Sequence, residues 1–268
     1  MSKIIVHPKS CKIIEDDFNF ISRVDHSLSF DIKGAEYTKA YQGYFDSSGE
    51  FIKWDGKKKL LNGDLTFPRG LLDKVIGLYK QFGKDCEVVN NHNRSITDSI
   101  SIESNLLKIN KAPRPYQIDA AAEVKNFDCG ILRMATGSGK TLVMALMTAL
   151  LNKQTIIYVI GKGLLYQLHD FFKTIFGPDV GIVGDGQCKI ADITIVSIWS
   201  AGQALGLGKK KISLDDFDGE KNISPQKYKD INALLKNAKV HIFDECHVAA
   251  CTTIQEIYRA INPEHIYG

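Results

Sequence analysis

The stretch Met134-Ala-Thr-Gly-Ser-Gly-Lys-Thr141 restricts the possible folds of this chain more than any other feature. It follows a short apolar run, residues 130–134, and precedes an apolar run of helical length, residues 142–151. A strand, a glycine-rich turn, Lys-Thr and a helix, in this order, are what a phosphate-binding loop requires. Glycine lets the backbone N–H groups turn inward around phosphate oxygens, and the following helix directs the positive end of its dipole at the same place. We therefore expect a nucleotide site here.

The residues of this loop have separate predicted roles. Lys140 is expected to reach the β- and γ-phosphates of ATP, and the hydroxyl of Thr141 to hold Mg²⁺. Met134 stands where such loops usually have their first glycine, but the core Gly-Ser-Gly-Lys-Thr is intact. A glycine-rich turn that merely precedes Lys-Thr is the alternative, and the flanking strand and helix argue against it. The predicted nucleotide contacts within the loop are Met134, Ala135, Thr136, Gly137, Ser138, Gly139, Lys140 and Thr141.

A second chemical signature, Asp244-Glu-Cys-His247, begins 104 residues after Lys140 (244 − 140) and follows the apolar run 239–243. A carboxylate at the end of a parallel strand beside a phosphate loop is suited to hold Mg²⁺, a role we assign to Asp244. Glu245 is placed to accept a proton from the attacking water and is, with Lys140, a predicted catalytic residue. His247 is expected to couple the nucleotide site to a neighbouring surface. Seen alone, the acidic pair is compatible with chance, but it follows an intact phosphate loop in the right order.

The composition is that of an ordinary globular protein. The chain has 268 residues, enough for about two domains, with 44% hydrophobic and 24% charged residues. Its net charge of +3 neither demands nor excludes a nucleic-acid partner. The six cysteines form no CxxC pair, and no apolar run approaches the ~20 residues of a membrane span. A reducing, cytoplasmic setting without membrane attachment is the expectation.

From residue 113 to 268, strands alternate with helices. The continuous apolar run 155–160 is typical of a buried parallel strand. Further strands are predicted at 180–183, 192–196, 239–243 and 265–267, with helices after the phosphate loop and after Gly161. The alternation predicts an α/β domain in which helices cover both faces of a parallel sheet.

Residues 1–112 differ in pattern and are predicted to form a small mixed α/β domain followed by a polar linker, residues 90–110. Strands are expected at 3–7, 11–14, 37–45, 50–54 and 86–89, and a helix at 71–82. The dipeptide Asp55-Gly56 predicts a tight hairpin turn. The basic run Lys57, Lys58 and Lys59 beside Trp54 suits a nucleic-acid surface, although on spacing alone a solvated charge run is the simpler interpretation.

Together these residues resemble a known family. Gly-Ser-Gly-Lys-Thr141 followed by Asp244-Glu-Cys-His247 resembles motifs I and II of superfamily 2 helicases, in the DExH branch. Arg114-Pro-Tyr-Gln117 resembles the upstream element whose glutamine reads adenine, which implies that role for Gln117. Residues 161–167 resemble motif Ia, and residues 196–200 resemble motif Ib or Ic. Since both motifs line the nucleic acid in that family, the resemblance implies DNA contacts by Lys162 and Trp199.

The N-terminal region narrows the resemblance. Tyr44-Phe, Trp54-Asp-Gly-Lys57 and Phe67-Pro-Arg-Gly-Leu71 resemble the N-terminal domain of phage branch-migrating helicases of the UvsW type. This implies that residues 1–112 engage duplex or branched DNA, with Arg69, Trp54 and the three lysines as contacts. In that family a second RecA-like domain supplies arginines that stabilise the transition state. Because motifs III to VI do not appear, we expect the N-terminal part of a longer helicase, truncated before motif III and weakly active in hydrolysis by itself.

Two other functions remain open. The motor subunit of a restriction-type system shares the same motifs, but no nuclease carboxylate cluster accompanies them here. A DNA-binding module with a vestigial nucleotide site is the other alternative. The intact Lys140, Thr141, Asp244 and Glu245 argue against it.

Overall fold

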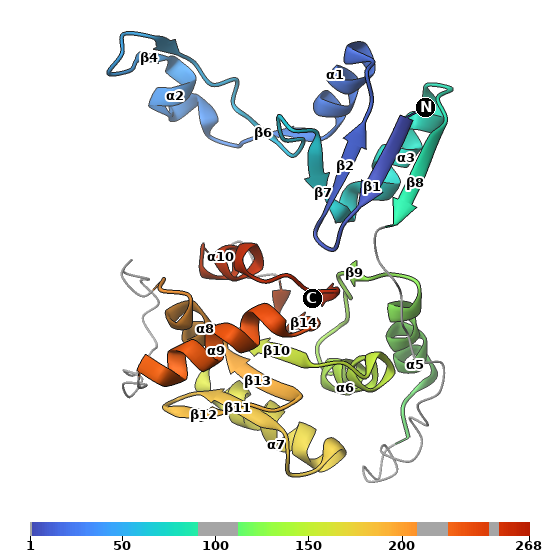
Figure 1. Ribbon diagram of the computed structural model, residues 1–268, viewed down its shortest axis with the longest axis vertical. Coiled ribbons are helices and arrows are strands. Elements are labelled where there is room, and N and C mark those ends of the chain that lie inside the picture. Colours follow the sequence, from blue (N-terminus) through green and yellow to red (C-terminus); the bar gives the residue numbers. More distant parts are fainter. Residues whose placement is uncertain (1, 91–111, 208–224, 247–251) are drawn as a thin grey trace. The chain divides into compact units, whose positions relative to one another are not determined.

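A computed structural model describes residues 2–90, 112–207, 225–246 and 252–268 of the chain. The chain divides into two compact units, Met1–Asn93 and Arg94–Gly268, each treated separately below (Figure 1). The expected domain boundary at 112/113 adjoins the segment 91–111, and the expected linker 90–110 lies almost entirely within that segment, outside the described residues. None of the helices in the described part of the chain is long and apolar enough to cross a membrane.

The second unit is built on a seven-stranded sheet of order β12-β11-β13-β10-β14-β15-β9. All neighbouring strands are parallel except β12, which runs antiparallel to β11. The predicted parallel sheet is thus confirmed, with an antiparallel edge that the sequence pattern did not indicate. In chain order the strands are β9 (Cys129–Gly130), β10 (Thr155–Val159), β11 (Gly181–Gly184), β12 (Gln187–Lys189), β13 (Ile193–Ser197), β14 (Val240–Phe243) and β15 (His265–Tyr267).

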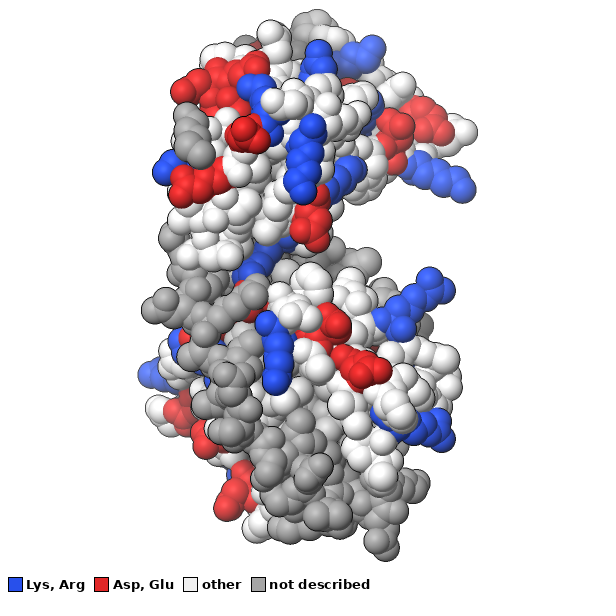
Figure 2. Space-filling view, turned by 90° about the vertical axis from the view of Figure 1, so that its right-hand side faces the viewer, with Lys and Arg blue, Asp and Glu red and all other residues white. Residues whose placement is uncertain are grey.

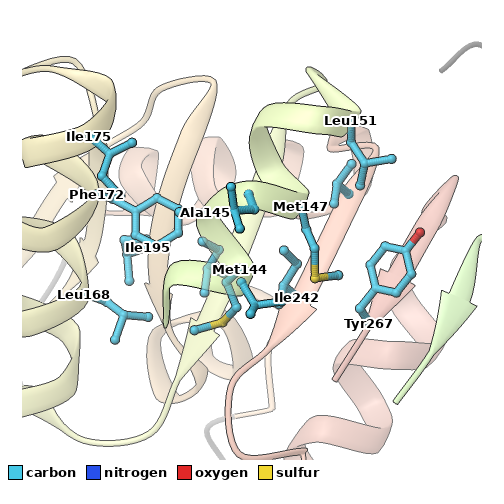
Figure 3. Close-up of a cluster of buried hydrophobic side chains, with 14 of the residues drawn as sticks. Met144, Ala145, Met147, Leu151, Leu168, Phe172, Ile175, Ile195, Ile242 and Tyr267 are labelled. Atoms are coloured by element: carbon cyan, nitrogen blue, oxygen red, sulfur yellow. The ribbon is translucent and has the colours of Figure 1, made fainter. Parts of the chain in front are cut away.

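Helices cover both faces of this sheet, as expected for buried parallel strands. One face packs against α5 (Pro115–Ala122), the short 3₁₀ helix η3 (Glu123–Lys125), α6 (Lys140–Leu151) and α7 (Lys162–Phe176). Figure 3 shows the resulting apolar cluster, in which Met147 of α6 and Phe172 of α7 lie among strand residues such as Ile242. The other face packs against α8 (Ile198–Ala204), α9 (Pro225–Asn237) and α10 (Thr252–Ala260).

Two local predictions for this unit need correction. The expected strand at 130–134 is reduced to β9, and beyond Gly130 the N–H of Leu132 still donates to the carbonyl of Gly268. Helices α8 and α10 were not predicted. Helix α8 follows β13 directly, so no turn signal in the sequence separates these two elements.

The first unit has a four-stranded sheet of order β7-β2-β1-β8. Its strands are β1 (Ser2–Val6), β2 (Ser10–Ile14), β7 (Thr66–Pro68) and β8 (Cys86–Asn90). Ile4 pairs with Ile13 and Val6 with Cys11, so these buried side chains share one face. Helices α1 (Phe18–Ser27) and α3 (Leu72–Gln81), the latter after the 3₁₀ turn η2 (Arg69–Leu71), cover that face.

Between α1 and β7 the chain forms an extension that the sequence pattern described incorrectly. The predicted strand 37–45 is instead a 3₁₀ turn η1 (Ala35–Tyr37), a short helix α2 (Lys39–Gln42) and only two strand residues, β4 (Tyr44–Phe45). Thr38 caps α2 by accepting a hydrogen bond from Tyr41 N–H, which favours helix over strand. Strand β4 pairs with β5 (Phe51–Ile52), whereas β6 (Lys57–Lys59) pairs with β3 (Ser29–Asp31). Asp55-Gly56 therefore connects β5 and β6 without making them a hairpin.

Two adjacent phenylalanines of α7 allow the core to be tested. Phe172 is fully buried, and its ring centroid lies 5.6 Å from that of Phe176, whereas Phe171 is only partly buried. We expect Phe172→Ala to lower the free energy of unfolding by about 3–5 kcal/mol, because a cavity replaces packed atoms. Phe171→Ala should cost less than half as much. Urea denaturation of the second unit, followed by circular dichroism, measures both, and equal effects would contradict the packing described here.

Candidate active site

The candidate site residues of the second unit lie at the carboxyl ends of its parallel strands. The phosphate loop follows β9, Asp244 and Glu245 follow β14, and Lys162 begins α7 just after β10. Because these strands are parallel members of one sheet, their carboxyl ends meet at the same edge. This edge is where open α/β sheets bind ligands.

The backbone of the loop has the conformation that its glycines allow. Gly137 and Gly139 have φ of 77° and 84°, in the left-handed region that disfavours other residues. A Cβ at Gly139 would also lie 2.4 Å from Nε2 of Gln117, so a side chain there would displace this amide from its hydrogen bond to Ser138. Ser138 closes the turn by donating from Oγ to the carbonyl of Ala135 over 2.6 Å. Helix α6 then begins at Lys140, so its free N-terminal N–H groups face the loop.

Two side chains from α5 hold this loop from outside. Gln117 Nε2 and the hydroxyl of Tyr116 both donate to the carbonyl of Ser138, over 2.7 and 2.8 Å. Oε1 of Gln117 accepts from the N–H of Arg114 at 2.9 Å, which caps the start of α5. Gln117 is buried, so both ends of its amide are fixed. Gln117 therefore joins the start of α5 to the phosphate loop. Together Gln117 and Tyr116 form a clamp on this loop, and the sequence did not predict the part played by Tyr116.

An ion pair links the two sequence signatures. Lys140 Nζ lies 2.9 Å from Oε1 of Glu245, and this hydrogen bond raises the pKa of Lys140. Burial raises the pKa of Asp244, as does the neighbouring charge of Glu245, while Lys140 opposes the shift. Glu245 has φ of 55°, an uncommon conformation for a non-glycine residue, and its N–H donates to Oδ1 of Asp244 at 3.1 Å. Backbone strain of this kind is concentrated at functional sites.

A pocket of about 400 Å³ opens beside the ion pair. Lys140, Asp244 and Glu245 contribute its polar wall, and Met134 contributes to an otherwise largely apolar lining with Met144 and Met147. Met134 also packs against the core under α6, so the residue that replaces the usual first glycine has a structural role. Gln117 and Thr141 lie outside this lining. The pocket therefore adjoins the phosphate loop and does not coincide with it.

The residues present fit a nucleotide with its magnesium ion. The loop between Ala135 and Lys140 combines two left-handed glycines with the free N–H groups of a helix start, and a Cβ built at Gly137 meets no atom within 4 Å. Lys140 supplies positive charge for phosphate oxygens. Thr141 and Asp244 offer the oxygen ligands that Mg²⁺ prefers.

The remaining predicted residues of this unit are less closely associated with the candidate nucleotide site. Lys162 is exposed and forms a 2.7 Å ion pair with Asp185, a residue that the sequence did not single out. Trp199 is partly buried in the first turn of α8. His247 lies outside the described residues, so its predicted coupling role has no structural counterpart here.

In the first unit the residues predicted to contact DNA differ in their exposure and in their interaction partners. Lys58 is exposed, whereas Lys59 is paired with Asp25 at 2.8 Å and Lys57 is partly buried. Trp54 is partly buried and donates from Nε1 to the carbonyl of Lys57. Arg69 is buried, and its guanidinium lies 3.5 Å from the carbonyl of His7. The burial of Arg69 argues against the surface role that the sequence resemblance implied for it.

The fold and the site together define the class of protein. It has a RecA-like α/β domain with a phosphate-binding loop, and a small α/β unit precedes this domain in the chain. Residues 110–268 match the family model described as "Type III restriction enzyme, res subunit", and the chain belongs to this family. A search of curated proteins finds no match.

Solved structures of similar fold include the UvsW helicase from bacteriophage T4, with a TM-score of 0.70 and 18% identity over 100% of this chain and 90% of that chain. A second structure of T4 UvsW gives a TM-score of 0.71 and 19% identity, over 100% of this chain and 52% of that chain. The expected resemblance to helicases of the UvsW type is thereby confirmed at the level of the fold. Family and fold together support a helicase-type nucleic-acid motor.

The clamp on the loop yields a prediction for Gln117→Glu. The carboxylate still accepts from Arg114 N–H and keeps α5 capped, but it cannot donate to the carbonyl of Ser138. We expect affinity for a fluorescent ATP analogue to fall about tenfold, because a mispositioned loop loses hydrogen bonds worth about 1–1.5 kcal/mol. Glu123→Gln, at the far end of α5, serves as the control. Unchanged affinity in Gln117→Glu would show that the clamp does not position the loop.

Proposed function

We propose that the chain is the N-terminal part of an ATP-dependent DNA helicase or translocase that remodels branched DNA. The observation that carries the proposal is the contact between Lys140 and Glu245, which brings the phosphate loop and the acidic strand end together at one sheet edge. The family match supports a motor of this general kind, and the T4 UvsW helicase shares the fold of both units. In this proposal residues 1–112 engage DNA and residues 113–268 form the first of two motor domains.

The residues have the following roles in the proposed reaction. The loop N–H groups bind the phosphates of ATP, and Lys140 exchanges Glu245 for the β- and γ-phosphate oxygens. Thr141 and Asp244 hold Mg²⁺, which when bound neutralises charge on the phosphates. Glu245, released from Lys140, accepts a proton from the attacking water. Gln117 keeps one N–H and one lone pair for the adenine while its other bonds fix the loop.

Motion along DNA requires a partner for this motor domain. We propose a second RecA-like domain that supplies arginines to the γ-phosphate, so that ATP binding and hydrolysis close and open the pair. The strand of nucleic acid would follow the ends of β10 and β13, where Lys162 and Trp199 lie. Both residues stand at the same sheet edge as the nucleotide site, which supports coupling between the two.

A restriction-type motor is the second candidate, and the description of the matching family favours it. The likeness of the whole chain to T4 UvsW, including the small first unit, supports the branched-DNA candidate instead. The two differ in their preferred substrate, since a restriction motor translocates on plain duplex. A vestigial nucleotide site, the third possibility, predicts that substitutions at Lys140 and Glu245 leave nucleotide affinity unchanged.

The ion pair predicts opposite effects for its two partners. Glu245→Gln should bind ATP about two- to fivefold tighter than wild type, because Lys140 no longer has to leave a carboxylate. Lys140→Ala should bind at least about tenfold weaker, since a charge-assisted hydrogen bond is lost. Asp170→Asn removes an exposed carboxylate of α7 and is the control. Isothermal titration with ATP and Mg²⁺ measures all three, and identical affinities would identify a vestigial site.

The basic residues of the first unit offer a specific DNA contact. Lys58 lies directly opposite Phe30 in the β3–β6 ribbon, and both side chains are exposed on the same face. A cation beside an exposed aromatic ring suits a phosphate and a neighbouring base. Figure 2 shows that on the face drawn there basic and acidic side chains are interspersed. DNA affinity in this unit is therefore expected to depend on individual residues such as Lys58.

Lys58 and Lys59 form a matched pair for testing this contact. Lys58→Ala should weaken binding to a four-way junction and lower the slope of log K against log salt by about 0.9, the value for one phosphate contact. Lys59→Ala should have less effect, because Lys59 is already paired with Asp25. Fluorescence anisotropy across a salt series, with plain duplex and single strand as comparisons, measures both. Equal effects of the two substitutions would contradict the assignment of Lys58.

A further inference from the structure

A polar cluster outside the nucleotide site surrounds Asp185, in the turn between β11 and β12. Its Oδ2 lies 2.7 Å from Lys162 Nζ and accepts a 2.7 Å hydrogen bond from the hydroxyl of Tyr166. The Tyr166 oxygen in turn accepts from Nε2 of Gln187 at 3.0 Å. The cluster thus joins the first turns of α7 to the β11–β12 turn through a chain of hydrogen bonds.

The backbone fixes the position of Asp185. Gly184, Asp185 and Gly186 all have positive φ, of 146°, 50° and 77°. A Cβ on Gly184 would lie 2.7 Å from a methyl carbon of Leu165 and 2.9 Å from Cβ of Ser197, so the turn sits tightly against α7 and the end of β13. Asp is one of the few residues that tolerate the left-handed conformation found at position 185. The carboxylate is therefore presented to Lys162 by a constrained turn.

Tyr166 makes this ion pair different from an ordinary surface pair. A free carboxylate and a lysine gain little from pairing in water, partly because both side chains must be ordered. Here the hydroxyl of Tyr166 already orients the carboxylate, and that hydrogen bond raises the pKa of Tyr166. The Lys162 side chain stays 65% exposed and that of Asp185 only 26%. A phosphate can reach Lys162 from solvent while Asp185 remains in place.

We propose that Asp185 is a built-in competitor for the phosphate at the nucleic-acid track: oriented by Tyr166, it neutralises Lys162 until a backbone phosphate takes its place. This rests on the proposed function, in which Lys162 contacts the nucleic acid. A phosphate must displace a carboxylate to gain the lysine. Asp185 therefore lowers the affinity of the track for any strand that engages Lys162.

The test is a double-mutant cycle on nucleic-acid binding. Wild type, Asp185→Asn, Lys162→Ala and the double variant are titrated with single-stranded and duplex DNA at a fixed low salt concentration, followed by anisotropy. Asparagine keeps the left-handed turn and the bond to Tyr166 but carries no charge. We expect Asp185→Asn to bind about two- to fivefold tighter, the factor that corresponds to an exposed ion pair. Lys162→Ala should weaken binding more, by the same factor, when residue 185 is asparagine.

Tyr166→Phe is the matched control, because it loosens Asp185 without altering charge and should tighten binding by less than Asp185→Asn. Thermal melting of each variant confirms that it is folded. Additive effects of Asp185→Asn and Lys162→Ala would overturn the proposal while leaving the proposed function intact, and so would weaker binding by Asp185→Asn. If neither wild type nor any variant binds nucleic acid, the proposed function fails, and the role of Asp185 fails with it.

Discussion

The three-residue strand β15 is the constraint on which the candidate site depends. It pairs with β9 through Ile266 and Tyr267 and with β14 through His265 to Tyr267, so it lies between the strand before the phosphate loop and the strand before Asp244. Gly268 extends this link, since its carbonyl accepts from Leu132 N–H and its N–H donates to Gly130. Lys140 and Glu245, 105 residues apart in the chain, can therefore meet at 2.9 Å.

Interactions at the amino ends of the parallel strands hold this short strand in place. Glu264, just before β15, lies 2.8 Å from Lys153 and 3.1 Å from Lys239, which precede β10 and β14. Burial favours the neutral form of Glu264, but the two lysines outweigh it and lower its pKa. The hydroxyl of Tyr267 also donates to the carbonyl of Phe127 beside β9. Charge pairs at the amino ends of the strands thus stabilise the strand alignment that positions the candidate site residues at the carboxyl ends.

The sequence predicted local structure correctly where the residue types at a position are compatible with only one backbone conformation or environment. Gly139 has a φ of 84° that favours glycine, and residues 155–159 are all buried, so the loop and β10 were predictable. It failed where tertiary contacts decide. The aromatic run 37–45 has strand propensity, but the cap at Thr38 starts the short helix α2, and strand remains only at Tyr44–Phe45. Arg69 has the character of a surface residue, yet it is buried beside the turn between β1 and β2, with contacts to the carbonyls of His7 and Lys9. Asp185 belongs to no motif, and only the fold brings it to Lys162.

The two lysines at the ligand-binding edge share one arrangement, although 22 residues separate them (162 − 140). Lys140 is held by Glu245 and Lys162 by Asp185, each at under 3 Å and each with the carboxylate in a left-handed backbone conformation. An unpaired lysine at this edge would attract any anion. A lysine held by an oriented carboxylate responds only to a ligand that gains enough elsewhere to displace it. In the proposed function, the chain's own acidic residues, held in position by constrained turns, therefore set what a phosphate must displace at both lysines.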